Sequence, residues 1–149
     1  MVAILPVDFR GDLVLSRRLA RQIAFQTLFQ IDLSKSDMES ALAQRLAEGT
    51  LSPENEEYVK TVVRGVHQQI SALDSQISTI SKAWEVHRLG FIDRSILRLA
   101  IYEIVFMDEI PVGVAVNEAV ELAKEFGDDE SPRFINGLLG TVVRDGDFQ

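Results

Sequence analysis

Three arginines near the start of the chain, Arg17, Arg18 and Arg21, have a spacing that could form a binding site for an anion. At about 100° per residue they fall within an arc of roughly 100° at the beginning of a predicted helix. Cations are unfavourable there, because the helix macrodipole is positive at its N-terminus. An anion such as an RNA phosphate would relieve both the dipole and the mutual repulsion of the arginines. Two alternatives remain open: a solvated basic end that binds nothing, and arginines that pair with acidic residues of the same chain.

The charge of the chain is distributed unevenly. The 149 residues carry a net charge of −8, which by itself argues against binding to nucleic acid. Residues 1–36, however, hold five basic and three acidic side chains, whereas the remainder holds ten and twenty. Such an acidic body with one basic end can repel nucleic acid everywhere except at one patch, or attract a basic protein.

Aromatic residues accompany the basic ones in two places. Phe25 and Phe29 lie one helical turn apart near the arginine arc, where they could stack on bases, meet a partner or pack against another helix. Phe134 follows Arg133 at the predicted start of the last helix. A cation beside an aromatic ring can hold a phosphate and its base, although core packing is the alternative for this ring as well.

Other polar residues favour structural interpretations. Asn117 and Asn136 lie among apolar residues, and buried amides must find partners, so we expect them to tie helices or loops together. Glu118 and Glu121 are three residues apart, which is typical of the solvated face of a helix.

Nothing in the sequence indicates an enzyme. His67 and His87 share no metal-ligand spacing, and the chain has no cysteine. Glycine-rich nucleotide loops, a Walker loop and a nucleophile elbow are also missing from the sequence. We therefore expect neither a catalytic residue, nor a metal, nor a cofactor. The apolar segments are too short and too charged to predict a membrane span, and no secretory signal is evident.

The segment FIDRSILRLAIYEIVF at 91–106 predicts the helix around which the others pack. Its apolar side chains surround most of the helix circumference, and such a helix is buried. We expect Leu99 to lie in the core. Residues 112–116 could form a strand by propensity, but their neighbours favour one continuous helix.

Capping residues and apolar periodicity predict the remaining helices. In the first of them, the predicted buried face consists of Leu19, Ile23, Ala24, Thr27 and Ile31. The predicted helices run from Ser16 to about Leu33, from Ser36 towards Gly49, from Ser52 through Ile70, from Asp74 through Trp84, from Phe91 to about Asp108, from Pro111 to Gly127 and from Ser131 to about Val143. We expect residues 1–15 to form a flexible arm, residues 16–143 a single domain and residues 144–149 a frayed tail.

Four blocks, in their order and spacing, resemble the NusB family of bacterial transcription antitermination factors. They are RRLARQIAFQTLF at 17–29, LRLAIYEI at 97–104, IPVGVAVNEAVELAKEFG at 110–127 and SPRFINGLL at 131–139. The resemblance implies an all-α fold of about seven helices in two packed small helical bundles. It also implies a cytoplasmic, non-enzymatic adaptor that binds boxA RNA of nascent ribosomal RNA together with the ribosomal protein NusE, in antitermination complexes with RNA polymerase.

The same resemblance assigns roles to individual residues. It places an RNA-binding surface at Arg17, Arg18, Arg21, Arg133 and Phe134, and a surface for the protein partner at Phe29, Leu33 and Asp93. Two other functions remain open: the NusB-like RNA-binding domain of a ribosomal RNA methyltransferase, and a helical module that binds only proteins.

Overall fold

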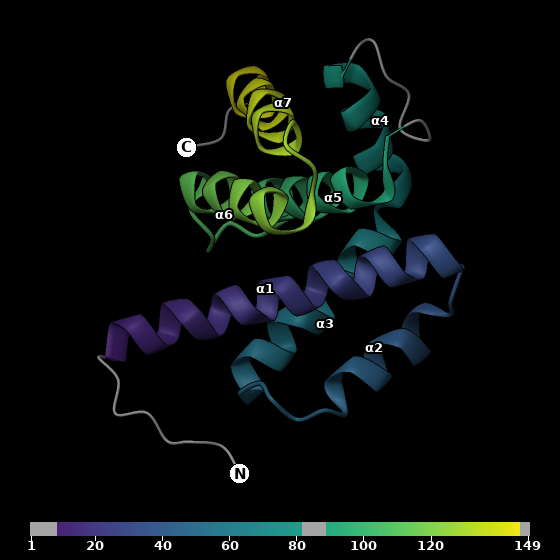
Figure 1. The fold of residues 1–149 in the computed structure, drawn as a ribbon, viewed down its shortest axis with the longest axis vertical. Helices are drawn as coiled ribbons and strands as arrows, with labels where there is room; N and C mark the ends of the chain where they lie inside the picture. The colour runs from purple at the N-terminus through teal and green to yellow at the C-terminus, as the bar shows by residue number, and fades with distance from the viewer. Residues whose placement is uncertain (1–8, 82–88, 147–149) are drawn as a thin grey trace.

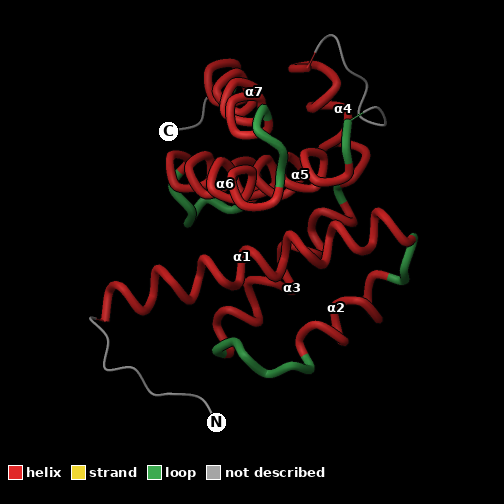
Figure 2. Tube along the Cα trace, in the orientation of Figure 1, coloured by secondary structure: helices red, strands yellow, loops and turns green. Residues whose placement is uncertain are grey.

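The described part of the computed structural model, residues 9–81 and 89–146, consists of seven helices without a strand (Figures 1 and 2). Side chains are described from Ser16 onward. The helices are α1 (Phe9–Ser34), α2 (Met38–Leu46), α3 (Pro53–Gln68), α4 (Ile70–Ser81), α5 (Phe91–Phe106), α6 (Val112–Phe126) and α7 (Ser131–Asp145). They form two groups, α1–α3 and α4–α7, which pack together through α1 and α5 (Figure 1). The all-α prediction with two small bundles is confirmed.

Helix α5 is the centre of the fold, as predicted. It contacts α1, α3, α4, α6 and α7. Leu99 is 1% exposed, and the polar side chains of Ser95 and Glu103 are equally buried. The apolar side chains of α5 that are buried in the core are those of Ile96, Leu97, Leu99, Ala100, Ile101 and Ile104. This helix therefore supplies core contacts in every direction.

Several helix boundaries agree with the sequence. The hydroxyl of Ser52 accepts a hydrogen bond from the backbone N–H of Asn55 at 3.3 Å, and Pro53 opens α3. A proline fits there, because the first N–H of a helix has no partner within the helix. Helix α6 is continuous from Val112 and ends at Gly127, so the helical interpretation of residues 112–116 is confirmed.

Other predicted boundaries are wrong. Asp37 rather than Ser36 caps α2, because its carboxylate accepts the N–H of Ser40 at 2.9 Å. The helix ends at Leu46, before Gly49, whose φ of 70° lies in the left-handed region. Helix α4 begins at Ile70, four residues before the expected cap. Glu130 is the N-cap of α7, and Ser131, which was expected to be the cap, is its first helical residue.

The first helix differs from the prediction in length and in its buried face. It begins at Phe9 rather than Ser16, so the last residues of the expected arm are helical. Leu19, expected on the buried face, is 42% exposed, whereas Ala20 is fully buried. The buried face is rotated by about one residue because α1 packs against α3 and α5 together. At the other end, α7 includes Arg144 and Asp145. Residues 1–8, 82–88 (with Trp84 and His87) and 147–149 lie outside the described residues.

Candidate nucleic-acid interface

Arg18 is the most exposed of the three arginines and is held by a carboxylate of α6. Its Nε and Nη2 donate to Glu118 Oε1 and Oε2 at 3.0 and 2.8 Å. The arginine side chain remains 47% exposed, whereas that of Glu118 is 10% exposed. The hydrogen bonds and the charge of Glu118 raise the pKa of Arg18 above its usual value. The carboxylate therefore fixes the guanidinium at the surface.

Arg21 lies in the interior and is not available to a phosphate in this structure. Its side chain is 4% exposed, and its Nε donates to Glu103 Oε2 at 3.0 Å. A further contact of 3.4 Å joins its Nη1 to Glu118 Oε1. Of the alternatives that the sequence left open, pairing with acidic residues of the same chain is the one that the structure shows for Arg21. Two buried carboxylates, supplied by α5 and α6, pair with it instead.

Tyr58 of α3 completes this buried group. Its hydroxyl donates to Glu103 Oε2 at 2.5 Å. Burial, followed by the charge of Glu103, raises the pKa of Tyr58 well above its usual value. Burial also raises the pKa of Glu103, and the charge of Arg21 opposes that effect. The group joins α1, α3, α5 and α6 beneath the surface on which Arg18 lies.

Arg17 points towards α3. Its Nε donates to Asn55 Oδ1 at 2.9 Å, and its guanidinium carbon lies 4.4 Å from the centroid of the Tyr58 ring. Such a position over an aromatic face favours a cation. Together with Ser16, Asn55 and Asn117, it lines a depression between α1, α3 and the start of α6, which we call the arginine depression. The remaining lining residues are Arg21, Ser52, Pro53, Glu54, Gly113, Val114 and Glu118.

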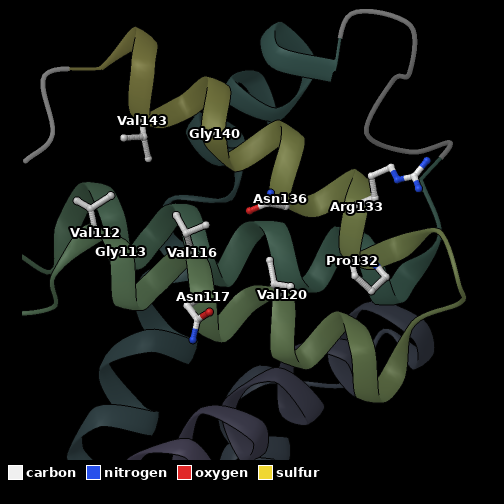
Figure 3. Close-up of a pocket in the computed structure, with 10 residues that line it drawn as sticks. All are labelled: Val112, Gly113, Val116, Asn117, Val120, Pro132, Arg133, Asn136, Gly140 and Val143. Atoms are coloured by element: carbon white, nitrogen blue, oxygen red, sulfur yellow. The ribbon is translucent and has the colours of Figure 1, made fainter.

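Arg133 lies at the end of a shallow groove between α6 and α7. The groove, of about 830 Å³, is lined by Val112, Gly113, Val116, Asn117, Val120, Pro132, Arg133, Asn136, Gly140 and Val143 (Figure 3). Val116 and Val120 project from α6 towards α7, and Arg133 stands at the end opposite Val112 and Val143 (Figure 3). We call this surface the α6–α7 groove.

Arg133 also borders a second depression, which contains Phe134 and Asp93. The junction depression, as we call it, is lined by Leu89, Gly90, Asp93, Asp128, Glu130, Ser131, Arg133 and Phe134. Burial raises the pKa of Asp93, and the nearby charge of Asp128 adds to the rise, against a hydrogen bond with Ser131. The structure thus places Phe134 beside acidic residues and away from the arginine depression.

Phe29 and Leu33 lie together in an apolar depression at the C-terminal half of α1. It also contains Phe25, Ile92 and Phe126, and Leu33 is 52% exposed. Phe25 is 2% exposed, with its ring centroid 5.1 Å from that of Phe126. Packing against another helix is thus the correct interpretation for Phe25. Ile92 of this depression and Asp93 of the junction depression are consecutive residues at the start of α5, although the two depressions share no lining residue.

Two sequence interpretations need correction, one concerning Asn117 of α6 and Asn136 of α7, and the other Glu118 of α6. Asn117 and Asn136 are exposed rather than buried, and the structure records no hydrogen bond from either side chain to another described residue. Glu118, expected on a solvated face, is 8% exposed. The spacing of apolar residues around Glu118 in the α6 sequence could have indicated its burial, but its partners lie about a hundred residues away.

The described residues include no cluster of three or more acidic or histidine side chains suited to a metal ion. No described helix combines the length and apolar composition needed to cross a lipid bilayer.

Fold and surface together define an all-helical protein with exposed arginines and amides along connected depressions. The model of the NusB family matches residues 18–144, and the chain belongs to this family. It is 44% identical over 138 residues to the transcription antitermination protein NusB of Symbiobacterium thermophilum, covering 87% of this chain and 90% of that protein. It is also 44% identical to the protein of the same name from Bacillus pumilus, covering 88% of this chain and 97% of the relative. The family is therefore one of transcription antitermination factors, not of enzymes.

Solved structures agree with this assignment. The NusB structure of T. maritima superimposes with a TM-score of 0.82 at 35% identity, covering 87% of this chain and 91% of that one. A chain from a crystal structure of the antitermination factors NusB and NusE in complex with double-stranded RNA matches with a TM-score of 0.81 at 26% identity. That match covers 88% of this chain and 98% of the other.

Proposed function

We propose that this chain is an RNA-binding adaptor in transcription antitermination, which holds boxA RNA of nascent ribosomal RNA together with the ribosomal protein NusE. The observation that carries the proposal is the position of Arg133 between two depressions. One is a groove in which Arg133 is the only charged side chain among the described lining residues, and the other contains Asp93, Asp128 and Glu130. An anionic strand and a basic protein can therefore bind side by side. The adaptor joins the complex with RNA polymerase in the cytoplasm.

In this proposal the exposed fraction of each side chain decides whether it contacts RNA or positions another residue. Arg17 and Arg18 bind phosphates, because Arg18 is 47% exposed, the half-buried Arg17 lines the arginine depression, and each is oriented by a hydrogen-bonded partner. Arg133 binds a further phosphate at the other end of the strand. Phe134 stacks on a base, since an uncharged base tolerates the neighbouring carboxylates better than a phosphate does. Arg21 acts as a positioning residue that holds Glu118, and through it Arg18.

The protein partner occupies the apolar and junction depressions. Phe29 and Leu33 offer an apolar contact that is partly open to solvent. Asp93, which follows Ile92 in the sequence and lines the junction depression, supplies negative charge to a basic partner. An apolar anchor beside a charged contact is a common arrangement in protein interfaces.

A binding experiment tests the proposal directly. The affinity of the chain for a boxA-like and for a scrambled RNA is measured by fluorescence anisotropy, with and without NusE. We expect tighter binding to the boxA-like RNA and a further increase in affinity with NusE. Equal, weak binding to both RNAs under all conditions would refute the proposal and leave a module that binds only proteins. The methyltransferase alternative receives no support from the relatives described above, which are antitermination proteins covered over at least 90% of their length.

A further inference from the structure

A pocket of about 370 Å³ lies between α1, α3, the start of α4 and α5. It shares no lining residue with the arginine depression, the α6–α7 groove, the junction depression or the apolar depression. Its size is at the lower end of the range of about 300–1,000 Å³ that is typical of small-molecule sites. We call it the Ser95 pocket. Its lining residues are Leu28, Ile31, Asp32, Lys35, Ser36, Val66, His67, Ile70, Ser95 and Arg98.

Four of the lining side chains are apolar, and three helices supply them. Leu28 and Ile31 come from α1, Val66 from α3 and Ile70 from α4. Leu28 and Val66 belong to the hydrophobic core, and the other two pack against it. Such a surface favours a hydrocarbon chain and offers no hydrogen bond to a bare inorganic anion.

The charged residues at the pocket form a network with an excess of positive charge. Asp32 Oδ2 lies 2.7 Å from Arg94 Nη2 and 3.4 Å from Arg98 Nη1. Lys35 Nζ lies 3.9 Å from Asp32 Oδ1. Arg98 also donates from Nε and Nη2 to Asp74 at 2.7 and 2.8 Å. Three cations thus surround two carboxylates, so the network favours an added anion over an added cation.

His67 is the remaining titratable lining residue. It is exposed and interacts with Asp37 and Glu39, neither of which lines the pocket. Glu39 is itself paired with Arg64 at 3.0 Å. These groups leave the excess of positive charge inside the pocket in place.

Ser95 adds a buried hydroxyl that has no acceptor. The residue is 1% exposed, and its Oγ has no hydrogen-bond partner among the described residues. Buried polar groups without a partner are uncommon and cost free energy. Arg98 follows three residues later on α5 and contacts its two carboxylate partners through three of the five N–H groups of a guanidinium. A carboxylate oxygen that enters between the two side chains can accept from both.

Lys35 has a backbone conformation that is unusual for its residue type. Its φ of 57° is the only positive value outside glycine in the described residues. The left-handed conformation after a helix normally favours glycine or asparagine, because a Cβ atom is crowded there. The lysine instead brings an ammonium group to the pocket on a side chain that is 80% exposed.

We infer that the Ser95 pocket binds a small aliphatic carboxylate. The hydrocarbon chain lies on the four apolar side chains, and the carboxylate accepts from Ser95 Oγ, Arg98 and Lys35. The inference does not depend on RNA or on the protein partner. The ligand bridges the two groups of helices, because α1 and α3 belong to one and α4 and α5 to the other. Its binding therefore stabilises the folded chain.

A free acid suits the pocket better than an acidic side chain of another protein. Aspartate and glutamate carry at most two methylene groups, which would leave much of the apolar lining uncovered. A hydrocarbon chain of several carbons covers it while its carboxylate reaches the buried hydroxyl.

Ligand titration tests the pocket in the full chain. The probe is hexanoate, and the controls at constant ionic strength are hexanamide, which lacks the charge, acetate, which lacks the chain, and inorganic phosphate. We expect a dissociation constant on the order of 1 mM for hexanoate, and binding weaker by roughly tenfold or more for each control. Nuclear magnetic resonance should show shifts at the backbone amides of Asp32, Val66 and Ser95 but not at Asn136. Equal binding of hexanoate and hexanamide, or no shift at the three amides, would overturn the inference.

The variant Ser95→Ala separates ligand binding from folding. It removes a hydroxyl that has no partner, so we expect the unliganded variant to be at least as stable as the parent in urea. Its affinity for hexanoate should fall several-fold. Ser75→Ala on the exposed surface of α4 is the control, with parental affinity expected. Parental affinity in Ser95→Ala as well would show that the hydroxyl does not bind the carboxylate, contrary to the inference.

Two lysines provide a matched test of the charge. Lys35 and Lys124 are both exposed, and each pairs with an acidic residue three positions earlier. Lys35→Gln should lower the affinity for hexanoate several-fold, whereas Lys124→Gln should leave it unchanged. Equal losses in the two variants would indicate a general effect of net charge and refute a specific site.

A peptide distinguishes a free acid from the end of a protein chain. A short peptide that ends in leucine with a free carboxylate is compared with its amidated form and with hexanoate. We expect hexanoate to bind and the peptide to bind more weakly, because the peptide backbone must also be accommodated. If the free-carboxylate peptide shifts the three amides and hexanoate does not, the pocket takes a protein C-terminus and the inference is wrong.

Discussion

Arg21 and Glu103 form an ion pair of 3.0 Å in which their side chains are only 4% and 1% exposed. The pair connects α1 to the central helix α5, and Tyr58 and Glu118 complete its hydrogen bonds. Charges buried in this way cost much free energy when they lose their partner. The pair therefore links the stability of the fold to the surface that presents Arg18.

Breaking this pair should destabilise the protein strongly. Arg21→Met leaves the Glu103 carboxylate buried and without its main partner, and we expect a loss of about 3–5 kcal/mol in the free energy of unfolding. Combining it with Glu103→Leu should recover part of that loss. Urea denaturation measures both values. Arg18→Gln is the control, with an expected cost of about 1 kcal/mol or less, because that side chain is 47% exposed. Similar costs for Arg21→Met and Arg18→Gln would contradict the structural role of Arg21.

The contributions of the three arginines to RNA binding should differ from their contributions to stability: Arg17 and Arg18 should matter and Arg21 should not. If Arg17 and Arg18 each neutralise one phosphate, Gln at either position should reduce the salt slope of single-strand binding by about 0.7. Arg21→Gln should leave the slope unchanged among the molecules that remain folded, because the Arg21 side chain is 4% exposed whereas that of Arg18 is 47% exposed. Titrations at several salt concentrations provide the slopes. A slope change at Arg21 equal to that at Arg18 would show that Arg21 leaves its buried position to contact RNA.

The sequence predicted local features better than distant pairings. The Ser52–Pro53 start of α3 and the Gly127 end of α6 were predictable, because each depends on residues within one turn. Asp74 was expected to cap α4, but it lies inside the helix and accepts from Arg98 Nε at 2.7 Å. Carboxylates that cap helices and carboxylates that bind distant arginines look alike in a sequence.

The same limit applies to the candidate site. The sequence identified the arginines but could not show that Glu103, 82 residues from Arg21, would bury one of them. Burial of Glu118 and exposure of Asn117 were both missed, although the residues are adjacent. Which of two neighbouring helical residues faces inward depends on how α6 packs against α5 and α7, and that is a tertiary property.

Truncation of the central helix tests the core. Leu99→Ala should cost about 2–5 kcal/mol, from lost burial and the cavity that remains. That loss is a large fraction of a typical stability of about 5–15 kcal/mol. Chemical denaturation measures the midpoint, with exposed Val114→Ala as a control expected to shift it little. An unchanged midpoint for Leu99→Ala would contradict the central position of α5.

Removal of the Phe134 ring should weaken RNA binding without changing its salt dependence. Phe134→Ala removes a stacking surface, and we expect a loss of about 1–3 kcal/mol in binding free energy. Phe134→Tyr retains the ring and should retain most of the affinity. A change in salt slope in the alanine variant would indicate that the ring instead positions Arg133.

Binding of the basic partner should depend on pH through Asp93. Burial and the nearby Asp128 raise the pKa of Asp93, so its carboxyl group is protonated at a higher pH than an ordinary aspartate. Ionised Asp93 attracts the partner, so affinity should be full above the raised pKa and fall as the pH decreases through it. Folding has the opposite dependence: the folded pKa exceeds the unfolded one, and the contribution of Asp93 to stability decreases as the pH rises between them. Isothermal titration with NusE across the mildly acidic range measures the binding effect.

Two substitutions at the same position complete this test. Asp93→Asn keeps the shape of the side chain and should bind NusE weakly, with less dependence on pH than the parent. Asp93→Lys should bind more weakly still, because it places a positive charge opposite a basic partner. Since Asp93 lies in the first turn of α5, where a negative charge is favourable, denaturation of both variants must show an intact fold. If both folded variants bind NusE with the parental affinity and pH dependence, Asp93 lies outside the interface and another residue of the junction depression supplies its charge.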